Sequence, residues 1–257
     1  MMLTMMPNEN LFIRSVLLLV FMQTTSCPSV AAELSTNTIH DGRRLEDIPV
    51  RRPRIHGGWN TQEDRHSYAQ INLNYRGEGH QCGGSLVAPD MVLTAGHCYR
   101  SFDRVEIGKY EKNDITDISE EFSSAFEIVH PGYDEDTTRF DVMLVKLRGT
   151  STLATPVRIN RDENLPSNGS MLTVIGMGYD GDWELPNVFQ ETSVRYQIND
   201  LCDNIVDENG TTLNGDLYPD MLCAGYDGRD SCYGDSGSPL ILTGDNQQED
   251  IQIGVVR

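Results

Sequence analysis

The sequence lacks any hydrophobic run long enough to cross a membrane. Its longest apolar stretch, residues 16–22, is far shorter than the roughly 20 residues that a transmembrane helix needs. Internal repeats and low-complexity tracts are also missing, which excludes a solenoid. With 257 residues and 38% hydrophobic composition, the chain can build one large or two small domains with hydrophobic cores.

Positive charge is scarce as well. The chain has 20 Lys plus Arg against 39 Asp plus Glu, a formal net charge of −19. Such a field repels polyanions and attracts cationic proteins and peptides, so nucleic acid is excluded as an expected partner. Most of the carboxylates fit a solvated surface that keeps the protein soluble.

The N-terminal region resembles a secretory signal peptide. The apolar stretch follows Arg14 and precedes the small residues of 29–32, where cleavage near Ala31 or Ala32 is expected. A buried N-terminal helix is the alternative. We therefore predict a signal peptide over 1–32 and a secreted, extracellular protein. The polar, Arg- and Pro-containing stretch 33–54 is typical of an exposed propeptide.

Cysteine usage agrees with that compartment. In secreted proteins cysteine pairs form disulfides rather than thiolate metal sites, so we expect neither metal nor cofactor. Of the six cysteines, Cys27 would leave with the signal peptide, and an odd number would remain. The extra one implies a free thiol, an intermolecular bond or a missing partner. Sequons at Asn168 and Asn209 are compatible with secretion.

After the linker, hydrophobic residues recur with period two, which predicts short strands in an antiparallel barrel or sandwich. Clusters of Gly, Pro, Asn and Asp separate the segments. Helix is rare, and the best candidate is 200–206, capped by Asn199 or Asp200. The expected strands cover 69–75, 85–87, 91–94, 122–129, 142–147, 172–175, 192–198, 240–243 and 251–256.

The strongest local motif is Gly-Asp-Ser-Gly-Ser-Pro at 234–239. It places Ser236 between small residues, where the amides of Gly234 and Ser236 can point into one space as an oxyanion hole. Taken alone, such a motif is equally consistent with an ordinary turn.

A histidine and an aspartate supply what a reactive serine needs. His97 follows a predicted strand in Thr-Ala-Gly-His-Cys (94–98), and Asp141 opens the apolar strand 141–147. A serine hydroxyl becomes a nucleophile when a histidine takes its proton and a buried carboxylate fixes the histidine tautomer. In isolation His97 would be interpreted as a packed or surface residue, and Asp141 as a turn carboxylate.

Together these motifs resemble the chymotrypsin and trypsin family of serine peptidases over 55–257. His97, Asp141 and Ser236 stand in the family's order, with His-Pro-Gly-Tyr-Asp (130–134) before the aspartate and Met-Leu-Cys-Ala-Gly (221–225) before the serine. The resemblance implies an all-β fold of two antiparallel six-stranded barrels, about 55–155 and 156–257, with the site between them.

The resemblance also implies roles for other residues. Cleavage after Arg54 would free the amine of Ile55 to pair with Asp235 and order the oxyanion loop. Asp230 would form the floor of a pocket for substrate Arg or Lys. The implied disulfides join Cys82 to Cys98 and Cys202 to Cys223, while the family's partner for Cys232 lies downstream of Arg257. Partners would be Arg- or Lys-containing protein and peptide substrates, an activating protease and protease inhibitors.

Several positions depart from the family pattern. Arg257 stands where the family usually has a serine beside the catalytic aspartate, so it is expected to pair with Asp141 or Asp230. His56, Met177 and Ser238 replace a valine, a tryptophan and a glycine. Lys109 stands where calcium-binding members place a carboxylate, so calcium is not expected.

The resemblance further predicts a second barrel that is incomplete at its C-terminus. The family's second pocket wall lies beyond Arg257, and a protein without that wall would hold a substrate backbone poorly. A fragment or a shortened gene sequence is our hypothesis for this difference.

Two other classes of function compete with a protease. A catalytically inactive homologue would act as a secreted binding protein, and active-site labelling separates it from an enzyme. A purely structural secreted β-module would leave the three motifs as coincidences, because fold alone does not fix function.

Overall fold

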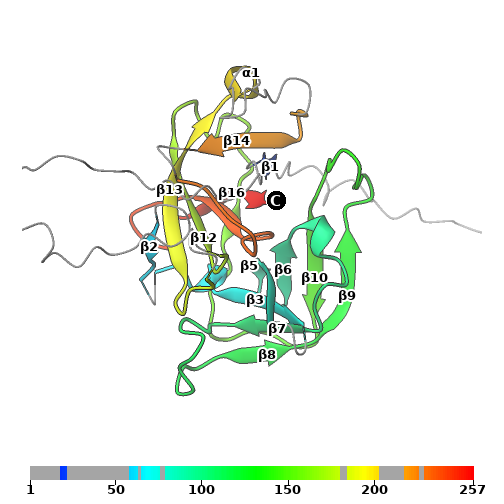
Figure 1. The fold of residues 1–257 in the computed structure, drawn as a ribbon, viewed down its shortest axis with the longest axis vertical. Coiled ribbons are helices and arrows are strands. Elements are labelled where there is room, and N and C mark those ends of the chain that lie inside the picture. The colour runs from blue at the N-terminus through cyan, green and yellow to red at the C-terminus, as the bar shows by residue number, and fades with distance from the viewer. Residues whose placement is uncertain are drawn as a thin grey trace, which may run out of the picture.

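The structure is a computed structural model that describes residues 18–21, 58–62, 65–75, 79–179, 184–202, 217–225 and 229–257 (Figure 1). For 18–21 it describes the backbone alone. Apart from that strand, the predicted signal peptide and propeptide lie outside the described residues, as do Arg54, Ile55 and His56. The described part is largely strand with very little helix, which confirms the expected all-β fold.

The first half of the fold consists of two antiparallel four-stranded sheets. One has the order β4-β3-β7-β8 and the other β5-β6-β10-β9. Both lie in the lower right part of Figure 1. The strands are β3 (Ile71–Tyr75), β4 (Gly79–Gly83), β5 (Ser85–Ala88), β6 (Met91–Thr94), β7 (Arg104–Ile107), β8 (Glu120–Phe122), β9 (Ser124–Val129) and β10 (Met143–Leu147).

Strand β10 shows why the period-two pattern predicted these elements. Met143, Val145 and Leu147 are buried, whereas Leu144 and Lys146 between them are only partly buried. Because successive side chains point to opposite faces, one face of β10 joins the larger hydrophobic core. That core extends to Ile175, Met177 and Val255 of the second half, so the two halves pack directly against each other.

The second half is an eight-stranded sheet with the order β1-β14-β13-β12-β15-β16-β11, and β2 pairs with β13. A smaller core that includes Leu172, Leu222 and Ile253 lies within it. Its strands are β1 (Leu18–Phe21), β2 (Trp59–Asn60), β11 (Arg158–Ile159), β12 (Met171–Gly176), β13 (Gln190–Gln197), β14 (Met221–Gly225), β15 (Pro239–Leu242) and β16 (Ile251–Val256).

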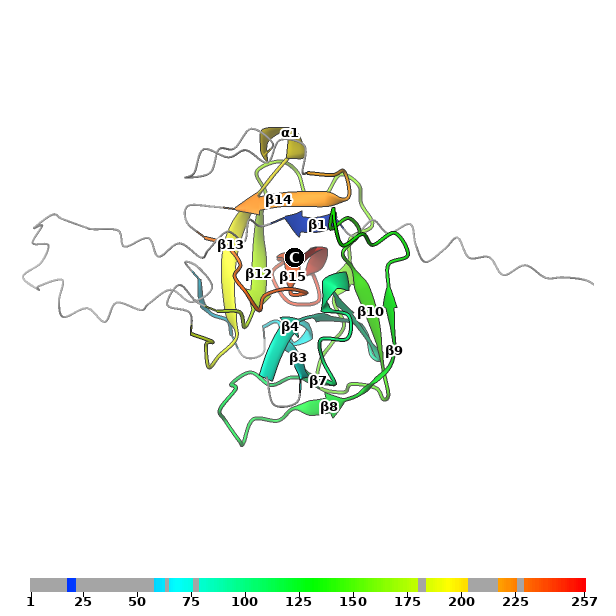
Figure 2. The ribbon, with the colours of Figure 1, turned by 45° about the vertical axis from the view of Figure 1, so that its right-hand side comes forward.

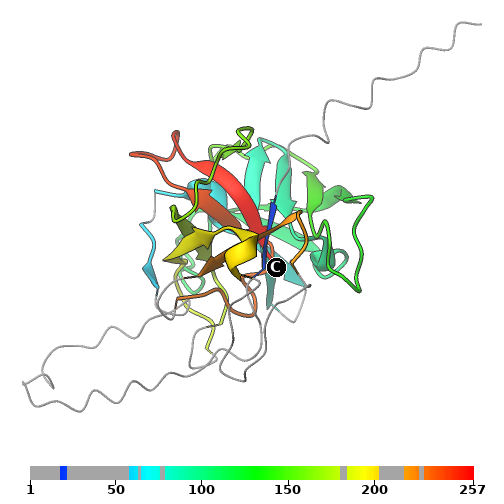
Figure 3. The same cartoon turned by 90° about the horizontal axis from the view of Figure 1, so that it is seen from above.

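Strand β1 closes this sheet into a ring. It pairs in parallel with both β14 and β16, and Figures 2 and 3 show it beside these strands. The path β1-β14-β13-β12-β15-β16 therefore returns to its start. The sequence predicts the core of a signal peptide for the same residues, and that prediction stays open.

Helical structure is limited to short turns in the described residues. The α-helix α1 (Asn199–Cys202) begins within one residue of the predicted start, and residues after Cys202 in the predicted segment are not described. Two 3-10 helices, η2 (Ser67–Ala69) and η3 (Gly96–Cys98), precede β3 and follow β6. None of the described helices is long and apolar enough to cross a membrane.

The structure contains both disulfides that the resemblance implies, Cys82–Cys98 and Cys202–Cys223. Cys232 is disulfide-bonded as well, which excludes the free thiol among the alternatives for the odd cysteine. The first disulfide ties β4 to η3, and the second ties α1 to β14. Each closed loop removes conformational entropy from the unfolded chain, an effect of about 3 kcal/mol.

A buried ionic cluster joins the segment before β3 to the segment before β16. The fully buried Asp250 accepts hydrogen bonds from both terminal nitrogens of Arg65, at 2.7 and 3.0 Å. It also accepts one from the Tyr68 hydroxyl at 2.7 Å, and it lies 3.1 Å from His66 Nδ1. One carboxylate thus holds the described chain near 65–68 against the second half.

Candidate active site

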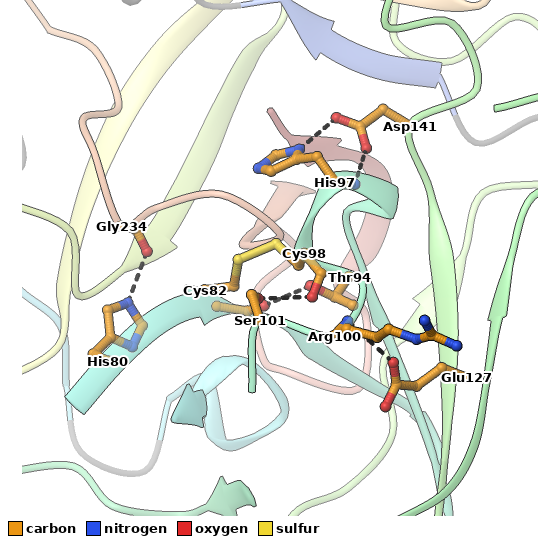
Figure 4. Close-up of a disulfide and its surroundings, with 11 residues drawn as sticks. His80, Cys82, Thr94, His97, Cys98, Arg100, Ser101, Glu127, Asp141 and Gly234 are labelled. Carbon is orange, nitrogen blue, oxygen red and sulfur yellow. Dashed lines mark hydrogen bonds and ion pairs between the residues drawn. A yellow bond between two sulfur atoms is a disulfide. The ribbon is translucent and has the colours of Figure 1, made fainter. Parts of the chain in front are cut away.

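His97 is carried by the short helix η3, directly after the buried strand β6. The Cys82–Cys98 disulfide fixes the next residue to β4, as Figure 4 shows. The His97 side chain keeps 35% of its surface exposed, so its ring reaches solvent while its backbone is held.

Asp141 makes two hydrogen bonds to His97 (Figure 4). Its Oδ2 lies 2.7 Å from His97 Nδ1, and its Oδ1 accepts a bond from the His97 backbone N–H at 2.7 Å. The Asp141 side chain is 1% exposed. Because an ionised carboxylate only accepts hydrogen bonds, Nδ1 carries the proton and Nε2 of the neutral ring is left as an acceptor.

Gly96 allows this close approach. A Cβ atom at Gly96 would lie 3.0 Å from Asp141 Oδ1 and 3.3 Å from the Val142 backbone nitrogen. Such contacts are tighter than ordinary packing permits, so a side chain here would push the carboxylate away from His97.

Ser236 lines the same pocket as His97 and Asp141, a hollow of about 280 Å³. The Ser236 carbonyl accepts a hydrogen bond from the Gly83 amide at 2.7 Å, which ties its loop to β4. The three predicted catalytic residues therefore meet at one pocket, although they come from 97, 141 and 236 in the chain.

The loop before Ser236 presents the predicted oxyanion groups. Gly234 has φ +92°, a conformation that residues with a Cβ rarely adopt. Among the hydrogen bonds between described residues, neither the Gly234 amide nor the Ser236 amide acts as a donor. Within the part of the chain that the structure describes, both amide N–H groups are thus available to donate a hydrogen bond to a ligand.

His80 is a contact of this loop that the sequence did not reveal. Its Nε2 donates a hydrogen bond to the Gly234 carbonyl at 2.7 Å (Figure 4). Burial lowers the pKa of His80 to about 4, so the ring is neutral near pH 7 and carries its proton on Nε2. The motif Gly-His-Gln-Cys-Gly at 79–83 contains no pattern that predicts a partner at 234, about 150 residues away.

Asp235, the predicted partner of the Ile55 amine, is fully buried. Its two oxygens accept hydrogen bonds from the Gly178 amide at 2.8 Å and the Cys232 amide at 2.9 Å. Burial raises the pKa of Asp235 to about 6, against the lowering effect of those two bonds. Because Ile55 is not among the described residues, the ion pair stays a prediction.

Asp230, the predicted specificity residue, is also held in a poorly solvated environment. Burial raises its pKa to about 7, the Ser231 amide bond at 2.8 Å opposes this, and the charge of Asp235 adds to it. Asp230 is not one of the described residues that line the 280 Å³ pocket. The role of Asp230 in substrate preference therefore stays a prediction.

Arg257 lines the pocket beside the predicted catalytic residues. Burial lowers its pKa, whereas the charge of Asp141 raises it. Of the two expected carboxylate partners, the structure thus places Asp141 within electrostatic reach. Tyr133 lines the same pocket, and burial raises its pKa to about 12.

The described residues provide no convincing metal site. Cys82, His97 and Cys98 have ligand atoms within 4.8 Å of one another, but the two cysteines are joined as a disulfide and cannot act as thiolates. In the acidic loop after β7, the Lys109 ammonium donates to the carbonyl of Asp114. The expectation that this loop does not bind calcium stays a prediction.

Comparison with known proteins agrees with this geometry. A sequence model of the family described as Trypsin matches residues 55–257. Serine protease 1 of Canis lupus familiaris is 32% identical over 200 residues, covering 76% of this chain and 77% of that protein. Trypsin V-A of Rattus norvegicus is 33% identical over 198 residues, covering 76% of each.

Trypsin-1 of Salmo salar is 34% identical over 203 residues, covering 76% of this chain and 78% of that protein. The match spans both halves of the fold and includes the loops that bring His97, Asp141 and Ser236 to one pocket. This chain belongs to the trypsin family of serine proteases.

Proposed function

We propose that this protein is a secreted serine endopeptidase that is made as a zymogen and cleaves peptide bonds after Arg or Lys. The observation that carries the proposal is the His97–Asp141 hydrogen bond at the edge of a pocket that Ser236 also lines. The family provides the reaction class, and this geometry provides the residues that would perform it.

The proposed reaction begins when Ser236 Oγ attacks the substrate carbonyl. His97 Nε2 accepts the hydroxyl proton, since Nδ1–H is committed to Asp141. The carbonyl oxygen becomes an oxyanion, which the amides of Gly234 and Ser236 stabilise. His97 then protonates the amine nitrogen as the C–N bond breaks, which leaves an acyl-enzyme. A water molecule attacks the acyl carbon as His97 takes its proton, and the Ser236 Oγ–C bond breaks as His97 returns that proton to Ser236.

Substrate preference would come from Asp230. A carboxylate with a raised pKa gains most from a cationic partner, because an Arg or Lys side chain replaces the solvation that burial removes. An uncharged side chain would leave this group without that compensation.

Activation would follow cleavage after Arg54 by another protease. The new Ile55 ammonium would pair with Asp235, whose buried side chain accepts from the Cys232 amide and which directly follows Gly234 in the chain. The pair would compensate the buried carboxylate and stabilise the oxyanion loop. Secretion fits this scheme, because both the activator and the substrates would be extracellular proteins; protease inhibitors are expected partners.

One experiment tests the whole proposal. Precursor and trypsin-nicked protein are assayed against an Arg-coumarin peptide and a Phe-coumarin peptide, with Ser236→Ala as the control. We expect activity only in the nicked wild type and only on the Arg substrate. Nicked protein that neither hydrolyses the peptide nor is labelled at Ser236 by a phosphonate would contradict the enzyme, and a preference for Phe would contradict the role of Asp230.

A further inference from the structure

The chain immediately before Asp141 has a strained backbone. Thr138 has φ +55° and Phe140 has φ +52°, values that non-glycine residues rarely adopt. Thr138 is β-branched and Phe140 is bulky, so neither conformation is intrinsically favourable. Such strain persists only where surrounding contacts impose it.

A buried carboxylate holds the second of these residues, Phe140, and its neighbour Arg139. Asp220 Oδ1 accepts a hydrogen bond from Arg139 Nε at 2.9 Å, and Asp220 Oδ2 accepts one from the Phe140 amide at 2.9 Å. The Asp220 side chain is 8% exposed. A carboxylate that accepts from both a guanidinium and a backbone amide forms two charge-assisted bonds, which are stronger than neutral ones.

Aromatic rings also pack against Arg139 and Phe140. The Arg139 guanidinium lies over the rings of Phe140 and Tyr218, each 4.9 Å from the ring centroid. The His130 ring also stacks on Phe140, with centroids 4.8 Å apart. These contacts restrict the side chains of Arg139 and Phe140, and thereby the backbone that leads to Asp141.

Asp220 and Asp141 belong to different halves of the molecule. Asp220 directly precedes β14, which the Cys202–Cys223 disulfide anchors, whereas Asp141 precedes β10. The Phe140 carbonyl accepts a hydrogen bond from the Val142 amide at 2.7 Å, so Asp141 is the central residue of a tight turn. Fixing Phe140 therefore fixes the direction in which the Asp141 side chain leaves the backbone.

We propose that Asp220 is a positioning residue for the reaction: it binds Arg139 and holds Phe140 in its strained conformation, so that Asp141 meets Nδ1 and the backbone N–H of His97. The inference rests on the proposed function of His97 and Asp141. Without Asp220, the Phe140 amide and the Arg139 guanidinium lose a buried acceptor, and the segment relaxes toward ordinary angles. Asp141 then turns away from His97.

The test uses activated full-length protein with Asp220→Ala, Asp220→Asn and, as a matched control, Asp250→Asn. Asp250 is another buried carboxylate that pairs with an arginine, but it is not among the described residues that line the pocket. We expect Asp220→Ala to lower kcat about 100-fold with little change in KM, because a displaced catalytic group slows the chemical step. Asp220→Asn, which keeps an oxygen acceptor for Phe140, should lose less.

A rescue variant separates positioning from general stability. In the Asp220→Ala background, Phe140→Gly permits positive φ without penalty, so we expect it to recover part of kcat. If the Asp220–Arg139 ion pair only joined the two halves, Phe140→Gly would not restore activity. Asp220→Ala would then lower the melting temperature, as Asp250→Asn does, while kcat stayed within about twofold of wild type. That result would overturn the proposal.

A spectroscopic readout makes the inference independent of turnover. The proton on His97 Nδ1 gives a downfield NMR resonance when it is bonded to Asp141, and we expect this signal in wild type and Asp250→Asn but not in Asp220→Ala. An inactive wild type with this same pattern would contradict the proposed function and support the role of Asp220. A signal that persists in folded Asp220→Ala would overturn that role. If the alanine variant does not fold, the same result in Asp220→Leu, which fills similar space without a hydrogen-bond acceptor, would overturn it.

Discussion

The chemistry of His97 depends on the side of the ring that carries its proton. Asp141 accepts from Nδ1 and thereby leaves Nε2 as the base. An asparagine at 141 could instead donate its amide N–H to Nδ1, which would select the opposite tautomer while preserving the shape of the site.

We therefore predict that Asp141→Asn stays folded but lowers kcat on an Arg-coumarin peptide about 10⁴-fold. The matched control is Asp136→Asn, an exposed residue of the same loop, which should retain wild-type activity. Active-site labelling at Ser236 should slow in parallel with kcat. Comparable rates for the two variants would refute the assigned role of Asp141.

The raised pKa of Asp230 predicts a pH dependence of substrate binding. Because its pKa is about 7, the free enzyme holds this carboxyl protonated below that value and ionised above it. A substrate Arg requires the ionised form, so kcat/KM for an Arg peptide should rise as pH increases through about 7. Asp230→Asn should weaken Arg binding and make the KM for the Arg peptide independent of pH, while the dependence of kcat on the base His97 remains; steady-state kinetics between about pH 5 and 9 would measure both.

Single residues also show what sequence could and could not predict. His97, Asp141 and Ser236 lie in motifs that carry their own signal, and the structure brings all three to one pocket. His80 and Asp220 had no such signal, because their roles arise from contacts with Gly234 and Phe140 that only the folded chain creates. Their local sequences resemble those of ordinary surface residues.

At the level of elements, period-two patterning located the long strands but not the irregular ones. Strands β12 and β16 were expected at nearly their observed bounds, because each buries a run of apolar side chains. Strand β4, Gly79–Gly83, contains two glycines and two polar residues, so its tertiary partners rather than its own propensity make it a strand.

The Asp250 cluster makes a further prediction at this scale. Its hydrogen bonds to Arg65, Tyr68 and His66 hold the pKa of Asp250 well below its usual range. Because this pKa is lower in the folded than in the unfolded chain, the ionised Asp250 stabilises the fold at pH values above about 4, the ordinary pKa of an aspartate. The stabilisation is lost progressively as the pH falls below about 4.

Asp250→Asn should therefore lower the free energy of unfolding by about 3 kcal/mol at neutral pH, since it leaves the Arg65 charge poorly compensated. The difference from wild type should shrink as pH falls below about 4. Urea unfolding at several pH values measures both effects. An equal difference at all pH values would show that the ionised form of Asp250 contributes nothing.

Activation should increase the stability of the oxyanion loop at pH values above those at which the Asp250 cluster loses its effect. In the uncleaved chain, the raised pKa of Asp235 means that its ionisation destabilises the fold as pH rises from about 4 to 6. Pairing with the Ile55 ammonium would remove this penalty. Nicked protein should thus melt at a higher temperature than precursor above pH 6, and the two should converge near pH 4.

The Arg54→Gln variant provides the control for that comparison. It should stay uncleaved under the same treatment and keep the melting temperature of the precursor at every pH. Normal processing of this variant would place the activation site elsewhere in the chain.

For the whole molecule, the net charge of −19 predicts how salt affects catalysis. An acidic enzyme attracts cationic substrates over distances that salt screens, with a Debye length of about 10 Å at 0.1 M. For a Lys-flanked Arg peptide, KM should rise between about 0.02 and 0.5 M NaCl, whereas a Ser-flanked peptide should change much less. An identical response of both peptides would exclude long-range attraction.

Secretion would change the ring of strands in the second half. Strand β1 pairs with both β14 and β16, and the same residues form the proposed signal peptide's apolar segment. If that segment is removed on export, β14 and β16 lose their shared neighbour, and a slot one strand wide opens between them. Their backbone amides and carbonyls would then be unpaired edges, which readily accept another extended chain. The precursor and the secreted protein would thus differ in their capacity to bind a strand, in addition to their length.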